Sequence, residues 1–435
     1  MPTSSPLEAV LIGAGNRGTF TYGTAALEHP ETLRFVAVAE PDAARRDRFA
    51  RQHGIPAGRC FASWQELLAA GRLAPALVCA TLDRQHVAPA VAALETGYHV
   101  LLEKPMAVTA EECVRIVQAQ ERTGLILMIS HVMRYAPFYE AMHQIITSGR
   151  LGDIVTAEQR ENVAFWHMAH SYVRGNWGNA ERSSPMILAK CCHDLDLLVW
   201  MLAGDPAARL HSFGSLLHFR PEHAPPGAPA RCTDGCPDAE ECPFYAPRLY
   251  LTDDLGWPTE TISVDLSYEA RLHALETGPY GRCVYHTDNN VVDHQVVNME
   301  LRSGAIATLV MHGHSDREER TMRYDGTRAT LRGRFSYSGQ PELTVHDHRS
   351  GALERVAVSG SSRHGHGGGD SGLVTAFARA VHSGSPDDGG SARGSLESHL
   401  LAFAAERSRL GGKVIDMAAF REEIEIAAVT TPECA

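Results

Sequence analysis

Short apolar runs alternate with longer amphipathic segments along the first 130 residues of the chain. The apolar runs cover 7–12, 35–39, 76–80, 99–102 and 125–130, and the amphipathic segments begin near 18 and cover 42–52, 85–95 and 110–122. Alternation of short strands with helices is typical of a parallel sheet that has helices on both faces. The pattern therefore predicts a doubly wound α/β domain over residues 1–132.

The pattern changes in the rest of the chain. The predicted elements there are a helix over 137–148, strands over 154–160, 296–301, 305–311 and 343–346, and helices over 373–381 and 396–409. Period-2 runs between 259 and 350 favour a mostly antiparallel sheet. We predict a second, α+β domain over 133–425, with a Pro- and Cys-rich insertion at about 219–250.

Composition narrows the class of ligand. The chain has 435 residues, enough for two or three domains, and its formal net charge is −12 with no basic block. That balance argues against nucleic acid or an anionic membrane as a partner and favours small molecules. We expect a cytoplasmic protein, because no apolar run is long enough to span a membrane and the first residues lack a basic signal region.

Ten cysteines in a chain of this length do not indicate a disulfide scaffold. Cys232, Cys236 and Cys242 form the one local cluster, which is one ligand short of a tetrahedral zinc site. Cys283 or a histidine such as His223 could supply the fourth ligand. The sequence leaves two interpretations open, a structural zinc or a set of free or packing thiols.

A glycine-rich turn follows the first apolar run. It has the sequence Gly13-Ala14-Gly15-Asn16-Arg17-Gly18. In a strand-to-helix turn, the three glycines allow a tight bend, close approach of backbone N–H groups to a pyrophosphate, and close packing of helix on strand. The turn therefore predicts a dinucleotide site.

Glu40 ends the next predicted strand, about 20 residues further on, where a carboxylate can accept hydrogen bonds from ribose hydroxyls. A carboxylate there also repels a 2′-phosphate, so we expect NAD in preference to NADP. Arg45 and Arg46 lie close enough in the sequence to oppose this preference.

Lys104 follows the fifth predicted strand, at the sheet edge where open α/β sheets bind their ligands. An ammonium group there can donate a hydrogen bond to a substrate oxygen and stabilise the charge that develops during hydride transfer. The alternative is an exposed lysine at a strand end.

Several motifs occur together in a recognisable order. They are the glycine-rich turn, Ala80-Thr81 with His86, Glu103-Lys104-Pro105, Arg134-Tyr135-x-Pro137 and Gly149-x-x-Gly152-x-Ile154. With them the chain resembles the Gfo/Idh/MocA family of oxidoreductases over residues 7–160, more loosely to about 204 and again near 324. The resemblance implies a Rossmann domain, a second domain with an open sheet, a nicotinamide cofactor, and sugars, cyclitols or related polyols as substrates.

The resemblance also assigns roles to single residues. It makes Lys104 catalytic or cofactor-positioning, and it places Thr81, His86 and Glu103 at the cofactor and Arg134 at the substrate. It also makes His193 a general acid/base, a role that suits an imidazole at neutral pH.

The surroundings of His193 depart from the family's pattern. Many relatives carry an aspartate four residues before this histidine, where this chain has Ala189. Lys190 lies three residues before it and could hold a substrate hydroxyl or shift the pKa of His193. Asp196 could orient His193 or have a purely structural role.

Two further segments carry groups suited to sugars. On a predicted loop over 166–179, Arg174, Asn176 and Trp177 provide donors and a flat ring, although a packed surface loop is the alternative. His366 lies in a glycine-rich segment that could approach a ligand, with a flexible linker or a His-x-His metal site as alternatives.

These observations predict an NAD-dependent oxidoreductase that acts on a sugar, amino sugar or cyclitol, and that associates with copies of itself. Two alternatives stay open: a lyase or glycosidase that retains NAD and oxidises its substrate transiently, and a regulator that binds NAD without catalysis.

Overall fold

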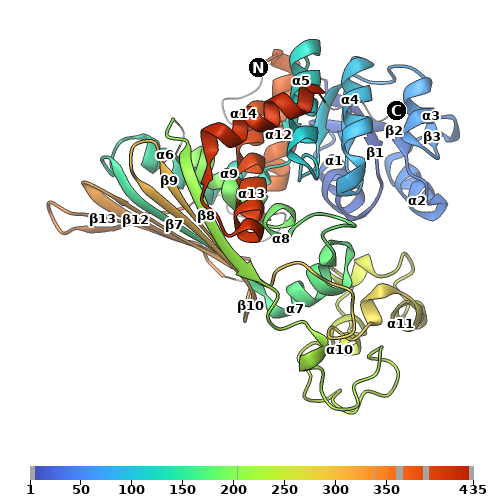
Figure 1. The fold of residues 1–435 in the computed structure, drawn as a ribbon. Helices are drawn as coiled ribbons and strands as arrows, with labels where there is room; N and C mark the ends of the chain where they lie inside the picture. Colours follow the sequence, from blue (N-terminus) through green and yellow to red (C-terminus); the bar gives the residue numbers. More distant parts are fainter. Residues whose placement is uncertain (1–4, 203, 338, 359–365, 386–390, 431–435) are drawn as a thin grey trace.

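The computed structural model describes residues 5–202, 204–337, 339–358, 366–385 and 391–430 (Figure 1). Its first domain is a six-stranded sheet with the strand order β3-β2-β1-β4-β5-β6, and every neighbouring pair is parallel. Its strands are β1 (Leu7–Ile12), β2 (Leu33–Ala39), β3 (Cys60–Phe61), β4 (Ala76–Cys79), β5 (His99–Leu102) and β6 (Leu127–Ile129). The doubly wound sheet predicted from the apolar pattern is confirmed.

Helices connect these strands. They are α1 (Thr24–Glu28), α2 (Ala43–His53), α3 (Trp64–Ala69), α4 (Val87–Glu95) and α5 (Ala110–Thr123). The strand order reverses between β1 and β4, so their carboxyl ends flank a crevice, which is where ligands bind in sheets of this kind. The glycine-rich turn follows β1 and Lys104 follows β5, so the topology brings both toward that crevice.

A nine-stranded sheet forms the second domain, in the order β14-β13-β12-β11-β7-β10-β9-β8-β15. The strands are β7 (Ile154–Ala164), β8 (Ala207–Ser215), β9 (His294–Leu301), β10 (Ile306–Ser315), β11 (Glu319–Gly326), β12 (Ala329–Ser336), β13 (Glu342–Asp347), β14 (Leu353–Arg355) and β15 (Ile415–Asp416). Only the β7–β10 pair is parallel, so the sheet is mixed but mostly antiparallel, as predicted.

One face of this sheet is covered by helices. The helices of this part are α6 (Pro137–Thr147), α8 (Met186–Ala189), α9 (Cys192–Met201), α12 (Gly369–Ser383), α13 (Ala392–Gly411) and α14 (Met417–Thr430). Figure 1 shows α6, α9 and α13 on one side of the sheet. Buried and partly exposed positions alternate along β9 and β11, as expected for a sheet with one covered face.

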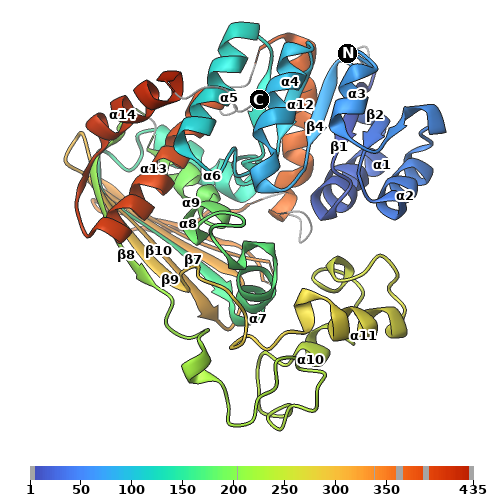
Figure 2. The same ribbon diagram turned by 45° about the vertical axis from the view of Figure 1, so that its right-hand side comes forward.

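The C-terminal helices join the two domains. Helix α12 contacts β1 and β2, and α13 and α14 contact α5 (Figure 2). Buried side chains of both sheets accordingly belong to one continuous core. In the described part of the chain, no helix combines the length and the apolar character needed to cross a bilayer.

The insertion lies between β8 and β9 and is longer than the predicted segment. It spans 216–293, carries α10 (Ala246–Tyr250) and α11 (Tyr268–Thr277), and extends from the sheet as the yellow-green part of Figure 2. The predicted loop over 166–179 is also different. It is helical, with α7 (Phe165–His167) followed by a buried π-helical turn over Met168–Arg174, because its apolar residues pack into the core.

Candidate active site

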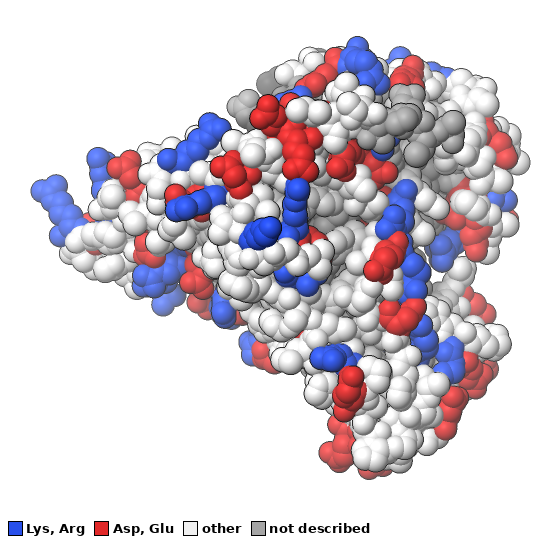
Figure 3. Space-filling model, in the orientation of Figure 1, with Lys and Arg blue, Asp and Glu red and all other residues white. Residues whose placement is uncertain are grey.

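A cleft of 2380 Å³ runs between the first domain, the second sheet and the insertion. Pockets for one small molecule commonly have about 300–1000 Å³, so this cleft has room for a dinucleotide beside a second ligand. Basic and acidic side chains both line it, and they are also interspersed on the face drawn in Figure 3. Recognition must therefore depend on individual groups, since the cleft carries no field of one sign.

The glycine-rich turn forms one end of the cleft and fits the three roles predicted for its glycines. Gly13 has φ +91°, and a Cβ there would lie 2.5 Å from the carbonyl oxygen of Ala80. A Cβ on Gly18 would lie 2.0 Å from the carbonyl oxygen of Gly13, so Gly18 serves close packing behind the cleft. Gly15 lines the cleft and its Cβ position faces open space, which leaves the backbone accessible to a pyrophosphate.

Glu40 reaches the glycine-rich turn from the end of β2. One carboxylate oxygen accepts from the backbone N–H of Ala14 at 2.8 Å and the other from that of Asp42 at 3.0 Å. Arg46 donates to the carbonyl oxygen of Glu40 and is turned toward the backbone, whereas Arg45 lines the cleft. The carboxylate is thus held in place at the position where a ribose would lie in a Rossmann domain.

Lys104 lines the cleft, two residues after β5 ends. Its Nζ donates to the carbonyl oxygen of Ala189 at 2.9 Å, and its ammonium is 5.9 Å from the ring centre of Trp177. An ammonium has three N–H donors, so two are left for a ligand in the cleft. This contact also ties the first domain to the segment that precedes His193.

His193 lies in the first turn of α9 and lines the same cleft. Burial lowers its pKa well below the ordinary value of 6.5, and the charges of Lys104 and His366 lower the pKa further. The imidazole is therefore neutral at neutral pH and able to accept a proton. Its Nδ1 is buried and has no hydrogen-bond partner among the described residues.

A cluster of charged side chains lies near Lys104 and His193, and four of its six members line the cleft. Its members are Glu161, His167, Lys190, Asp194, Glu318 and Arg320. Lys190 Nζ lies 3.1 Å from Glu161 and 3.6 Å from Glu318, and Arg320 pairs with Glu161 at 2.6 Å. Burial, with the nearby charges of Asp194 and Glu318, raises the pKa of Glu161 to about 7 against the opposing effect of Arg320 and Lys190.

His366 connects the catalytic end to the glycine-rich turn. Its Nδ1 lies 2.9 Å from Asp370, which also pairs with Arg17 at 3.0 Å, and Arg17 in turn pairs with Glu103. His366 has φ 52°, an unfavourable backbone conformation that a non-glycine residue rarely adopts. It lines the cleft as predicted, and the preceding His364 lies outside the described residues.

Most residues predicted for catalysis, cofactor binding or substrate binding line the cleft, and five do not. Those that do are Gly13, Gly15, Asn16, Arg17, Glu40, Thr81, Lys104, Asn176, Trp177, Lys190, His193 and His366. Glu103 and His86 are buried behind the cleft, where His86 lies between the carbonyl oxygens of Thr81 and Pro105. Gly18 packs behind the turn, as described above.

Arg134 and Arg174 are placed away from the cleft, which argues against their predicted contact with substrate. Arg134 forms a two-pronged ion pair with Asp196 inside the second domain. Asp196 also contacts His131, so its role is structural and not the orientation of His193. Arg174 points into the insertion.

Several cleft residues were not predicted. Trp166, Trp257, Glu260, Tyr280, Glu318, Arg320 and Tyr337 line the cleft from the second domain and the insertion. Glu260 accepts from the side chain of Asn16 at 3.0 Å, so the insertion touches the glycine-rich turn directly. These residues lie in segments without a motif, and only the mixture of aromatic and charged types in 166–179 gave a signal.

The four cysteines predicted as zinc ligands lie together, outside the cleft. Cys232, Cys236, Cys242 and Cys283 line one small cavity in the insertion and are all free thiols. His223 is not among the lining residues. Across the described ranges, no three His, Cys, Asp or Glu side chains already converge as the ligands of a metal ion.

Comparison with protein families gives two matches. A model described as an oxidoreductase family with an NAD-binding Rossmann fold matches residues 7–131, and a model for the C-terminal α/β domain of the same family matches 143–415. Together they cover most of the chain.

Comparison with known proteins gives partial matches. The chain is 34% identical to trans-1,2-dihydrobenzene-1,2-diol dehydrogenase of Bos taurus over 145 residues, which are 33% of this chain and 42% of that protein. It is 33% identical to inositol 2-dehydrogenase 2 of Saccharopolyspora erythraea over 129 residues, which are 29% of this chain and 34% of that protein. The chain thus spans less than half the length of these two relatives.

A solved structure shares the whole fold. It is an oxidoreductase from Agrobacterium radiobacter in complex with NAD⁺, L-tartaric acid and magnesium, with TM-score 0.68 and 18% identity. The match covers 95% of this chain and 99% of that one.

Proposed function

The chain belongs to the Gfo/Idh/MocA family of NAD-binding oxidoreductases, and from this premise we propose that it transfers hydride between nicotinamide and a hydroxyl-bearing carbon of a sugar, amino sugar or cyclitol. One observation carries the proposal. Lys104 and His193 line the same cleft as the glycine-rich turn, although they come from different domains.

In this proposal the chain's own residues handle the oxygen and its proton. Bound nicotinamide supplies a ring carbon that accepts or releases hydride. In the oxidation direction, Lys104 donates a hydrogen bond to the substrate oxygen and stabilises the negative charge that develops on it. His193 removes the hydroxyl proton, which its lowered pKa allows because the imidazole is neutral beforehand.

Our assignment of the cofactor site uses the residues at the glycine-rich turn. Gly13, Gly15, Asn16, Arg17 and Thr81 line the pyrophosphate end, with Gly18 behind the turn, and Glu40 receives the ribose hydroxyls. The fixed carboxylate of Glu40 favours NAD over NADP. Of Arg45 and Arg46, which could oppose this preference, only Arg45 lines the cleft. Glu103 and His86 support the site from behind.

The assignment of a polyol substrate relies on the second wall of the cleft. Trp177 and Trp166 offer flat faces for C–H surfaces, and Asn176, Lys190 and His366 offer hydrogen-bonding groups. We therefore place the substrate between Trp177 and the charge cluster, with its reacting oxygen at Lys104.

A second candidate function is a lyase or glycosidase that retains NAD. The contact between Glu260 and Asn16 favours it, because it holds the insertion across the glycine-rich turn, where it can slow the exit of a bound dinucleotide. Net redox chemistry releases NADH on each turnover, whereas this alternative does not.

The test is a panel of sugars, amino sugars and cyclitols, assayed with NAD⁺ and NADP⁺ by nicotinamide absorbance and by product analysis. We expect NADH to form with at least one polyol and a lower KM for NAD⁺ than for NADP⁺. Product formation without NADH, together with co-purified nucleotide, supports the retaining alternative. Absence of turnover with every compound contradicts both.

Self-association and a cytoplasmic location remain proposals. Exposed apolar side chains on the sheet, including Val155, Phe213 and Ile306, support a contact with a second copy. The free thiols of the nine described cysteines support a reducing compartment. Light scattering coupled to gel filtration tests the first, and a single-copy mass contradicts it.

A further inference from the structure

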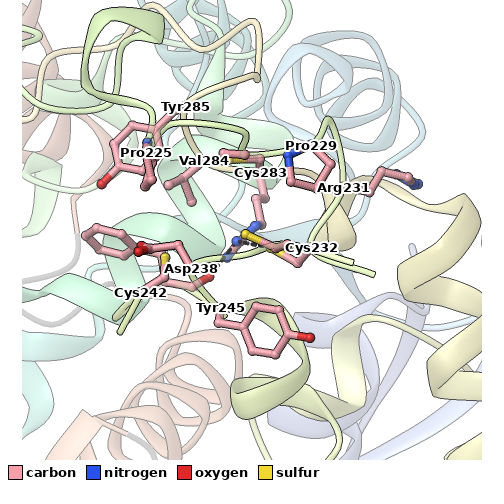
Figure 4. Close-up of a pocket in the computed structure, with 14 residues that line it drawn as sticks. Pro225, Pro229, Arg231, Cys232, Asp238, Cys242, Tyr245, Cys283, Val284 and Tyr285 are labelled. Atoms are coloured by element: carbon pink, nitrogen blue, oxygen red, sulfur yellow. Dashed lines mark hydrogen bonds between the residues drawn. The ribbon is translucent and has the colours of Figure 1, made fainter. Parts of the chain in front are cut away.

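Four cysteines from separate parts of the insertion surround one small cavity. Cys232, Cys236, Cys242 and Cys283 line it, and its volume of 10 Å³ is about what one water-sized sphere needs. In Figure 4, Cys232, Cys242 and Cys283 approach the cavity from different chain segments. None of the four lines the cleft, so the cavity is distinct from the candidate active site.

Backbone contacts hold these cysteines near one another. The N–H of Cys232 donates to the carbonyl oxygen of Gly281 at 2.8 Å, and the N–H of Cys283 donates to that of Ala230 at 2.9 Å. These two bonds form an antiparallel bridge that joins the two cysteines' segments. The N–H of Cys242 donates to the carbonyl oxygen of Asp238 at 2.9 Å, within the loop that carries Cys236.

A buried cation points at this cavity. Arg174 is 1% exposed, and its guanidinium donates to the carbonyl oxygens of Arg282 and Phe244 at 2.7 and 2.6 Å and to the sulfur of Cys232 at 3.5 Å. Within the described ranges, no carboxylate forms an ion pair with Arg174. Burying a charge is costly without an opposite charge nearby, and thiolates at this cavity would provide it.

The outer part of the insertion has only a small hydrophobic core. Around α10 and α11, the separate buried cluster consists of Cys232, Ala246, Tyr250 and Leu275. Segments of fewer than about 80 residues with so small a core are usually stabilised by disulfides or a metal. The cysteines here are free thiols, so no disulfide stabilises this described part, and a metal is the other stabiliser that these side chains could provide.

Two of the thiols accept hydrogen bonds from the backbone. The N–H groups of Phe244 and Tyr285 donate to the sulfurs of Cys242 and Cys283. Hydrogen bonds of this kind support thiolate ligands. The four side chains do not converge on one point, so they must rotate inward to bind an ion.

We propose that Cys232, Cys236, Cys242 and Cys283 bind one zinc ion that stabilises the insertion. Binding releases the four thiol protons, and the four thiolates with one divalent cation leave a net charge of −2, half of which Arg174 offsets. A single ion fits the small cavity, whereas an iron–sulfur cluster needs more room. The inference does not depend on the proposed function.

The test is elemental mass spectrometry of the full-length protein, purified without metal-affinity resin or chelator. We expect one zinc per chain, released stoichiometrically when a mercurial reagent titrates the thiols. Cys236→Ser should lose the zinc, and Cys60→Ser, which changes a cysteine of the first domain, should keep it. Loss of zinc should also lower the melting temperature.

Two results would overturn the proposal. One is wild-type protein with no stoichiometric metal that also fails to take up Co²⁺ with the absorption of cobalt–thiolate bonds. The other is iron with inorganic sulfide in place of zinc. Because both measurements use wild-type protein, they remain decisive even if Cys236→Ser does not fold.

Discussion

The two ends of the cleft are held together in different ways. At the glycine-rich turn, backbone groups make the main contacts. Glu40 accepts from two backbone N–H groups, and Gly18 packs against the backbone of Gly13. At the catalytic end, charged side chains from distant segments hold one another, as Lys190 does with Glu161 and Glu318. The first end depends on shape and the second on charge.

This difference has consequences for what each end can do. A binding surface built from backbone is rigid and insensitive to pH, as a site for an unchanging dinucleotide requires. A cluster of buried charges holds protons that it can gain or lose near neutral pH, which is useful where a proton must move. Substitutions at the two ends should therefore have separable effects on binding, stability and turnover.

The largest expected effect is at Lys104. Lys104→Ala should lower kcat by roughly 100-fold or more, because it removes the donor to the reacting oxygen. The affinity for NAD, measured by calorimetry, should change by less than about threefold, since the glycine-rich turn is intact. Lys413→Ala is the matched control on an exposed lysine. Loss of NAD binding in Lys104→Ala would break the distinction between the two ends.

A pH-dependent effect is expected at Glu161. Its pKa is about 7 in the folded protein and 4.5 ordinarily, so the stability that its bound proton contributes is complete below pH 4.5 and is lost as pH rises through 7. In Glu161→Gln, the amide side chain stays neutral at every pH in this range. Its free energy of unfolding, relative to wild type, should rise by roughly 3 kcal/mol from pH 4.5 to 8.

Urea denaturation across this pH range measures the effect. Parallel curves for the variant and wild type would show that Glu161 is ionised throughout, and the charge cluster would then hold no proton near neutrality.

At the glycine-rich turn, a pair of alanine substitutions distinguishes a glycine needed for packing from a glycine needed for access of the cofactor. Gly18→Ala should lower the free energy of unfolding by about 1–3 kcal/mol, because its Cβ would meet the carbonyl oxygen of Gly13. Gly15→Ala should leave stability nearly unchanged and weaken NAD binding, because its Cβ points into open cleft. Equal losses of stability in both variants would contradict this assignment.

The smallest effect is expected where the insertion meets the glycine-rich turn. Glu260→Ala removes the acceptor for Asn16 and should raise the dissociation rate of NAD by a few-fold, about 1 kcal/mol or less. Glu276→Ala, an exposed change in the same insertion, is the control. Stopped-flow displacement measures the rate, and an unchanged rate in Glu260→Ala would remove the support for retained NAD.

The two ends also differ in how far the sequence predicts them. The turn from Gly13 to Gly18 and the lysine after β5 are local patterns whose meaning depends on one strand and one helix, so both were placed correctly at the crevice. The catalytic end depends on partners far apart in the chain, such as Lys190 and Glu318. No periodicity or spacing in the sequence predicts such pairs.

The errors in the second domain have a common physical cause. The mixture of polar and aromatic residues in 166–179 suggested a loop, but 168–174 form a buried helical turn in which Arg174 donates to carbonyl groups that only the tertiary fold supplies. Arg134 was expected at the substrate, and its buried partner Asp196 holds it elsewhere. For both arginines, burial among distant partners decided the role.

The most direct test of the central claim is a crystal structure of the protein with NAD⁺. We predict that the pyrophosphate lies on the glycine-rich turn and that the nicotinamide ring lies beside Lys104, with His193 facing the same side of the ring. A nicotinamide ring that lies away from Lys104, or on the opposite side from His193, would contradict the account.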